Sequence, residues 1–244
     1  MAELDELLKN PGNYKQGKNY VGSSIVFCAE FENKKYIVKQ PRPFSPVINA
    51  YYVFQDKFFF GARKLMQQEE AFRREYEKME ELHGFCSPFA WDFDGRTLVR
   101  EYIEGADFRS LPFDWKVASL EDALESMEKI HSRGVAIGDA HVKNTVMRND
   151  KKLFWLLSGA YDESNLTKAK AVDLLKFVYS AYTVTRVEKF ALYAARVAAG
   201  YHDNEVMAMA RELIEPVSAA RLWFPTRVPI DGKLNEEIKG ILRG

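Results

Sequence analysis

The stretch that decides the fold is HSRGVAIGDAHVKNTV, residues 131–146. It follows a helix-like segment and brings together four polar side chains within six residues: Asp139, His141, Lys143 and Asn144. Such a concentration of reactive groups is typical of a functional loop. The alternative is a helix-to-strand connection whose polar residues are incidental, and the rest of the chain decides between the two.

The composition is that of a globular protein. The chain has 244 residues, enough for one large domain or two small lobes. Hydrophobic residues make up 47% and charged residues 29%. Because 35 basic residues balance 35 acidic ones, the overall charge gives no reason to expect nucleic acid or an anionic membrane as a partner.

Cysteine usage and the N-terminus favour a cytoplasmic protein. Cys28 and Cys86 are not in a CxxC pair, and the four histidines do not have zinc-ligand spacing. The acidic N-terminus lacks the basic start and apolar run of a signal peptide. No stretch approaches the roughly 20 apolar residues that span a bilayer. We therefore expect a soluble protein in a reducing cytoplasm, without structural zinc or disulfides.

The first part of the chain is rich in strand patterns. SSIVFCAEF (23–31) and KKYIVK (34–39) are separated by the turn-like ENK, and two prolines end the second run. FAWDFDGRTLVREYIEG (89–105) predicts another hairpin, turning at Asp94-Gly95. Between them, EEAFRREYEKMEELHG (69–84) has the apolar spacing of a helix whose charged residues lie on the other face. Its apolar positions are Phe72, Tyr76, Met79 and Leu82.

The second part is mainly helical. Four runs have helical spacing: residues 119–134, 168–184, 186–201 and 204–223. Ser119, followed by Asp122, predicts a capped start for the first. Because strands come first and helices second, we expect an α+β arrangement in two lobes.

Residues 44–65 are crowded with aromatic side chains. One interpretation is a helix or irregular segment packed on the core. The other is an exposed surface, within residues 47–60, that docks a protein or a membrane.

In this order of elements, KIHSRGVAIGDAHVKNTV resembles the catalytic loop of the protein-kinase-like superfamily. Gly138-Asp139 looks like the variant found in RIO kinases, aminoglycoside phosphotransferases and lipopolysaccharide Kdo kinases, with Ile137 in place of the usual histidine. The resemblance implies that Asp139 accepts or orients the proton of an attacking hydroxyl and that Asn144 holds magnesium. It also implies that Lys143 or His141 approaches the transferring phosphoryl group.

Three further motifs extend the resemblance to a nucleotide site. Lys39 stands where the strand lysine of kinases contacts phosphates, and Glu75 where the helix glutamate pairs with it. LVREYIEG (98–105) resembles the hinge, where backbone groups of Glu101 and Ile103 would face an adenine. Each motif has a simpler interpretation: a solvated lysine, a glutamate on the wet face of a helix, and an edge strand leading into a loop.

A fourth motif concerns support of the loop. KAKAVDLLKF (168–177) resembles a segment of the small kinase of the tRNA threonylcarbamoyladenosine machinery, which implies that Asp173 braces the catalytic loop through backbone hydrogen bonds. Otherwise Asp173 is a carboxylate at a helix N-terminus. Together the motifs imply a two-lobed kinase-like fold, with a β-rich N-lobe at 1–104 and a helical C-lobe at 105–244.

The sequence departs from the kinase pattern in two places. KNYVGSS offers Gly22, Ser23 and Ser24 as a degenerate phosphate-binding loop. Leu157 stands where kinases have the aspartate of Asp-Phe-Gly, and leucine cannot ligate a hard cation. Asp162, a few residues on, is a candidate substitute ligand or a loop residue that caps the next helix.

Two functions follow from the resemblance. The first is an atypical kinase that uses ATP and magnesium (or manganese) to phosphorylate a protein serine or threonine, or a hydroxyl of a sugar or lipid headgroup. The second is a pseudokinase, a nucleotide-binding or protein-interaction module that has lost catalysis with its metal-binding aspartate.

Overall fold

The computed structural model describes residues 2–20, 24–43, 47, 50–51, 53–54, 66–83, 90–159, 163–217 and 230–244. Two compact units emerge. The first unit contains the described residues up to Ile103, except Val53 and Phe54, and also Ser158 and Gly159. The second unit contains those two exceptions, residues 104–157, and the described residues from Glu163 onward. The chain thus returns briefly to the first unit, which no sequence pattern indicated.

The first unit is built on an antiparallel sheet. Its described strands lie in the order β1-β2-β3-β5-β4. Their bounds are β1 Lys15–Tyr20, β2 Ile25–Phe31, β3 Lys34–Gln40, β4 Trp91–Phe93 and β5 Leu98–Glu101. Both predicted hairpins are confirmed, as β2–β3 and β4–β5. Glu32 and Asn33 have φ of 51° and 62°, the left-handed conformation that a two-residue hairpin turn requires.

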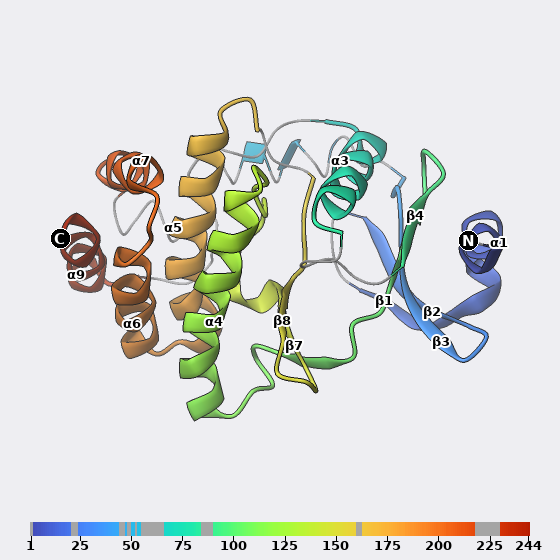
Figure 1. Cartoon of the computed structure of the whole chain (residues 1–244), viewed down its shortest axis with the longest axis horizontal. Coiled ribbons are helices and arrows are strands. Elements are labelled where there is room, and N and C mark those ends of the chain that lie inside the picture. Colours follow the sequence, from blue (N-terminus) through green and yellow to red (C-terminus); the bar gives the residue numbers. More distant parts are fainter. Residues whose placement is uncertain are drawn as a thin grey trace. The chain divides into compact units, whose positions relative to one another are not determined.

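Two helices cover opposite faces of this sheet (Figure 1). Helix α1, Ala2–Lys9, is followed by the short 3-10 helix η1, Pro11–Tyr14. The leucines of α1 pack into a core with side chains from β2, β3 and β5: Leu4, Leu7, Leu8, Phe27, Ala29, Tyr36, Val38 and Val99. Side chains alternate along a strand, so Ile37 and Lys39 of β3 point to the face of helix α3, Gln68–Glu81.

Most of the apolar positions predicted for helix α3 are confirmed as buried. Phe72, Met79 and Leu82 are buried. The expectation that all its charged residues are solvated is wrong, because Glu75 and Lys78 are each only 5% exposed. Both find partners inside the first unit, which is what permits a charged group to be buried.

The second unit is mainly helical around one buried helix. Its helices are α4 Phe113–Ser132, α5 Leu166–Thr185, α6 Glu188–Ala199, α7 Asn204–Ile214 and α9 Gly232–Arg243. Helix α5 contacts both α6 and α7, and most of its residues are buried. None of the described helices is long and apolar enough to cross a membrane.

The predicted start of α4 is wrong. The helix begins at Phe113, so Ser119 lies inside it, 1% exposed, and its hydroxyl donates to the Lys116 carbonyl. A serine within a helix bonds back to the preceding turn when its side chain is buried, and the same residue type therefore does not mark a cap.

The second unit also contains a small sheet, whose first strand precedes α4 in the chain and whose other two strands follow it. Its described strands have the order β6-β7-β8, with bounds β6 Gly105–Asp107, β7 Thr145–Arg148 and β8 Leu153–Trp155. The 3-10 helix η2, Val142–Asn144, precedes β7. The stretch 131–146 therefore runs from the last turn of α4 through η2 into β7.

The aromatic segment at 47–60 is described only in part. Val47, Tyr51 and Phe54 are 70%, 46% and 51% exposed. These three side chains are therefore not packed in the core, while the docking role of the segment stays a prediction.

Helix α1 is expected to be part of the core of the first unit. Leu7→Ala, at a fully buried position, should lower the free energy of unfolding by about 2–5 kcal/mol in urea titrations. Lys9→Ala, at an exposed position of the same helix, is the control and should change it by less than about 0.5 kcal/mol. An unchanged midpoint for Leu7→Ala would mean that α1 does not support the sheet.

Candidate active site

The first unit brings Lys39 and Glu75 together as an ion pair. The Lys39 Nζ donates to Glu75 Oε1, joining β3 to α3. The two side chains are 18% and 7% exposed. Sequence reasoning placed both residues at a nucleotide site, and the structure shows that they are paired rather than separately solvated.

A second cation lies near this pair. Arg100 of β5 is opposite Ile37 in the sheet and is 8% exposed. Burial lowers the pKa of Lys39 below its usual value; the Glu75 carboxylate opposes that shift, and the Arg100 guanidinium adds to it. These two cations and one carboxylate together carry a net positive charge, which suits an anionic ligand such as a phosphate chain.

The predicted hinge is only partly available to a ligand. The Glu101 amide donates to the Ala90 carbonyl (2.7 Å), and the Tyr102 amide donates to the Lys35 carbonyl (2.9 Å). The Glu101 carbonyl accepts a long bond of 3.4 Å from Arg100. For Glu101, the carbonyl is therefore the backbone group that can still take a strong hydrogen bond, whereas Ile103 lies beyond the paired residues of β5.

The second unit folds the loop motif so that Asn144 turns back onto Asp139. Its Nδ2 donates to the Asp139 carbonyl (2.8 Å) and to Oδ2 of the Asp139 carboxylate (2.9 Å). His141 Nε2 lies 3.6 Å from the other carboxylate oxygen. Three of the four residues singled out in the sequence thus meet, while Lys143 is exposed on η2.

Asp173 braces this loop from the middle of α5. Its carboxylate accepts the Ile137 amide (2.6 Å) and the Gly138 amide (3.0 Å). Asp173 is 1% exposed and lies well inside the helix, so the interpretation as a helix N-terminal carboxylate is wrong. Gly138 has φ of 92°, a conformation that favours glycine, which explains why the loop has no side chain there.

His131 is a member of the site that sequence reasoning missed. It lies in the last turn of α4, is 2% exposed, and its Nε2 lies 3.3 Å from Asp173 Oδ2. Its position one helical turn after the buried Met127 was the available signal, because both then share the inner face of α4.

The segment after β8 is fastened to α3. Lys78 Nζ donates to the Ser158 carbonyl (2.7 Å). A Cβ on Gly159 would lie 2.0 Å from the Ala71 carbonyl oxygen and 2.8 Å from the Glu75 amide nitrogen. Only glycine permits this close approach, so the segment directly contacts the helical turn that carries Glu75.

The loop of the second unit offers few oxygen ligands for a metal. The Nδ2 of Asn144 is directed to the Asp139 carboxylate, while Leu157 is 8% exposed and has no side-chain oxygen. Within the described residues, no group of three histidine, cysteine, aspartate or glutamate side chains could hold a metal ion. Gly22, Ser23 and Asp162 lie outside the described residues, and Ser24, in a bend before β2, is half-buried.

Comparison with known proteins identifies the fold. No family model and no curated protein matches the chain. Among solved structures it is similar to WaaP in complex with acyl carrier protein, with a TM-score of 0.51 and 16% identity over 96% of each chain. At this identity the likeness concerns the fold alone. The chain has an α+β kinase-like fold, with a β-sheet N-terminal region and a helical C-terminal region.

Glycine is expected to be required at position 159. Gly159→Ala should lower the free energy of unfolding by about 1–3 kcal/mol, because the added methyl group overlaps the backbone of α3. Gly12→Ala is a matched control in the same unit, where a Cβ would meet nothing within 4 Å. Equal stability of the two variants in urea would show that the segment does not contact α3 in solution.

The Lys39–Glu75 pair is expected to be energetically coupled. Lys39→Met leaves a buried carboxylate without its main partner and should cost about 1–3 kcal/mol of unfolding free energy. Adding Glu75→Gln should recover at least half of that loss, because the unpaired charge is removed. A double-mutant cycle by urea unfolding tests this, and additive losses would contradict the pairing.

Proposed function

We propose that the chain is an atypical ATP-dependent phosphotransferase that transfers the γ-phosphate to a hydroxyl group. The observation that carries the proposal is the buried Lys39–Glu75 pair in a chain of kinase-like fold. The Glu75 carboxylate fixes the ammonium group of Lys39 and opposes the lowering of its pKa by burial, which favours the charged form that coordinates nucleotide phosphates. The hinge carbonyl of Glu101 and the backbone of Ile103 would then bind the adenine.

The transfer itself is assigned to the catalytic loop. Asp139 would orient the attacking hydroxyl and accept its proton, because its carboxylate is one-third exposed and is positioned by Asn144. His141 lies beside it, and Lys143 is exposed, so either can approach the negative charge of the transferring phosphoryl group.

A magnesium or manganese ion fits this site only in part. Such an ion, when bound, neutralises charge on the phosphates. Asn144 would supply one oxygen ligand, with Asp162 as a further candidate. No step of the transfer is assigned to the metal, because Leu157 provides no oxygen where kinases place their second ligand.

The acceptor is proposed to be a hydroxyl of a sugar or lipid headgroup, or of a protein serine or threonine. The likeness to WaaP, solved with acyl carrier protein, also supports a protein partner for this chain. The exposed side chains of Val47, Tyr51 and Phe54 are candidates for that contact. A cytoplasmic location is consistent with a need for ATP.

A pseudokinase is the second candidate, and Leu157 is the observation that favours it. Without a carboxylate at that position, the loop can bind nucleotide without transferring phosphate. In this case Asp139 would be retained for its hydrogen bonds with Asn144 rather than for catalysis.

Thermal unfolding with ATP tests the proposal. ATP at 100 times its dissociation constant should stabilise the parent protein by about 2.7 kcal/mol with magnesium or manganese, and less in EDTA. Lys39→Ala should abolish this stabilisation, whereas Lys34→Ala, at the exposed start of the same strand, should keep it. If no variant responds to ATP under any condition, the nucleotide-binding proposal fails.

Two further variants separate the enzyme from the pseudokinase. If the parent is an enzyme, Asp139→Asn should keep ATP binding but slow release of labelled phosphate by about 10²–10⁴-fold. If only Leu157→Asp gains metal-dependent stabilisation by ATP, the parent has lost its metal site and is a binding module.

A further inference from the structure

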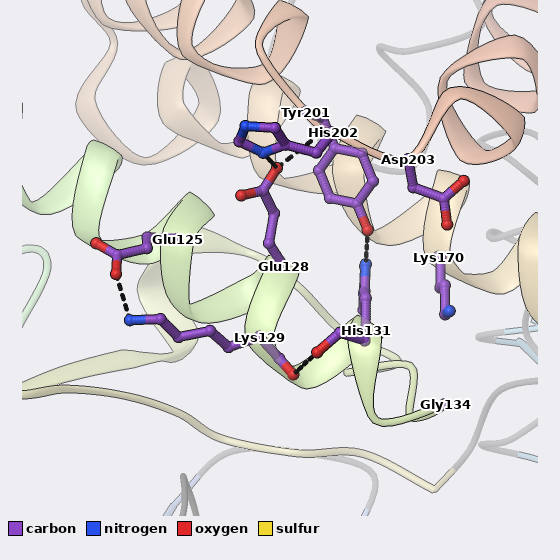
Figure 2. A pocket seen from close by; sticks show the side chains of 10 residues that line it. Glu125, Glu128, Lys129, His131, Gly134, Lys170, Tyr201, His202 and Asp203 are labelled. Atoms are coloured by element: carbon purple, nitrogen blue, oxygen red, sulfur yellow. Dashed lines mark hydrogen bonds and ion pairs between the residues drawn. The ribbon is translucent and has the colours of Figure 1, made fainter.

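A surface pocket of about 560 Å³ lies in the second unit, behind the start of the loop stretch 131–146. Figure 2 shows it between the C-terminal half of α4 and the segment that joins α6 to α7. Its lining residues are Glu125, Glu128, Lys129, His131, Ser132, Gly134, Lys170, Tyr201, His202 and Asp203.

Most charged groups of this pocket are satisfied by one another or by the backbone. Glu125 pairs with Lys129. Glu128 accepts bonds from the amide and the Nδ1 of His202, each 2.9 Å. Asp203 caps α7 by accepting the Glu205 and Val206 amides. These contacts stay at the rim, so they do not connect the pocket with the interior.

Tyr201 makes the connection. Its hydroxyl oxygen lies 2.6 Å from His131 Nδ1, as Figure 2 shows, and the two rings meet edge to face with their centroids 5.9 Å apart. Tyr201 is 5% exposed. Burial, and then the nearby carboxylates of Asp203, Glu128 and Asp173, raise the pKa of Tyr201 above its usual value, so the hydroxyl keeps its proton.

The hydrogen-bond directions follow from the partners. The Asp173 carboxylate is an acceptor, so His131 Nε2 carries the proton that it donates to Asp173. In the neutral imidazole, His131 Nδ1 then accepts from the Tyr201 hydroxyl. The Asp173 oxygen that receives His131 also accepts the Ile137 amide, at 2.6 Å. One continuous chain of bonds thus runs from the pocket wall to the residue two before Asp139.

We propose that Tyr201 is a positioning residue for the catalytic loop, because its hydroxyl fixes the tautomer and orientation of His131 and thereby the Asp173 carboxylate that holds the Ile137 and Gly138 amides. A molecule that enters the pocket and moves the Tyr201 ring would change the same bonds. The link between tyrosine and loop is a property of the fold; its effect on phosphoryl transfer rests on the proposed function.

Tyr201→Phe tests the link, since it keeps the ring and removes only the hydroxyl. Amide hydrogen exchange, followed by NMR, should accelerate about fivefold to tenfold at Ile137 and Gly138, as expected when one hydrogen bond of a buried network is lost. Exchange in the centre of α5, for example at Phe177, should stay unchanged.

Tyr193→Phe is the matched control. The Tyr193 hydroxyl, on α6, also bonds to a side chain of α4, Glu121, but it is not among the described hydrogen-bond partners of His131. This variant should leave exchange at Ile137 and Gly138 as in the parent. Equal acceleration in both variants would show general loosening of α4 and overturn the proposal.

The nitrogen chemical shifts of His131 provide a second measurement, which changes only if Tyr201 hydrogen-bonds to the His131 ring. In the parent, its nitrogen resonances should report a proton on Nε2 and a hydrogen-bonded Nδ1. In Tyr201→Phe, the Nδ1 resonance should move towards that of an imidazole nitrogen without a donor. An unchanged Nδ1 resonance would overturn the assigned direction of the bond.

A double-mutant cycle separates the effect of the Tyr201–His131 bond from a change in general stability. In a His131→Leu background, Tyr201→Phe should cause no further acceleration at Ile137 and Gly138, because the link has already been cut. Additive acceleration would show that Tyr201 acts by another route. None of these measurements uses ATP, so their failure is distinguishable from failure of the proposed function.

Discussion

The second unit depends on one buried carboxylate. Asp173 is 1% exposed, and taking an ionised group out of water is costly unless its oxygens are fully engaged. Two backbone amides and His131 engage them. The stabilisation is mutual: the loop amides have no strand or helix to bond with, and the carboxylate has no salt bridge to a lysine or arginine among the bonds described. Each satisfies a group that would otherwise be left unpaired in the interior, so the loop and helix α5 are held in one arrangement.

In the first unit, helix α3 is the element to which several other parts of the unit are bound. One face of this helix pairs with the lysine of β3, bonds the carbonyl of Ser158 and contacts the backbone of Gly159. An amphipathic helix normally turns its charged residues to water, but here two of them are the groups that reach out to other parts of the unit. Apolar residues at these two positions would fill the core equally well. The burial of Glu75 and Lys78 is therefore explained by the groups they bind rather than by core packing.

Local patterns predicted the parts of the fold that depend on local physics. The β2–β3 and β4–β5 hairpins were predictable because alternating apolar residues and turn residues occur together, and Asn33 and Gly95 do adopt positive φ. Strand β1 was not, because KQGKNY is polar and fully exposed, and only pairing with β2 makes it a strand. Helix α1 is eight residues long, and its stability comes from packing on the sheet rather than from its own sequence.

The residues of the candidate site also divide into those that local motifs predicted and those that only packing brings together. Lys39, Glu75, Asp139 and Asn144 were found because each stands in a short motif, and the structure then supplied their pairing. His131 begins the loop stretch, but Tyr201 is 70 residues further on and belongs to no motif, so nothing local indicated that they would meet. Long-range pairs of this kind follow from the packing of helices, which a single sequence does not specify residue by residue.

The absence of a side chain at Gly159 has a mechanical consequence. With backbone against backbone, there is no intervening side chain whose rotation could absorb a shift between α3 and the segment after β8. The Lys78–Ser158 bond adds a second attachment one residue away. Helix α3 and the segment after β8 are therefore expected to move together, so a displacement of one of them also displaces the other.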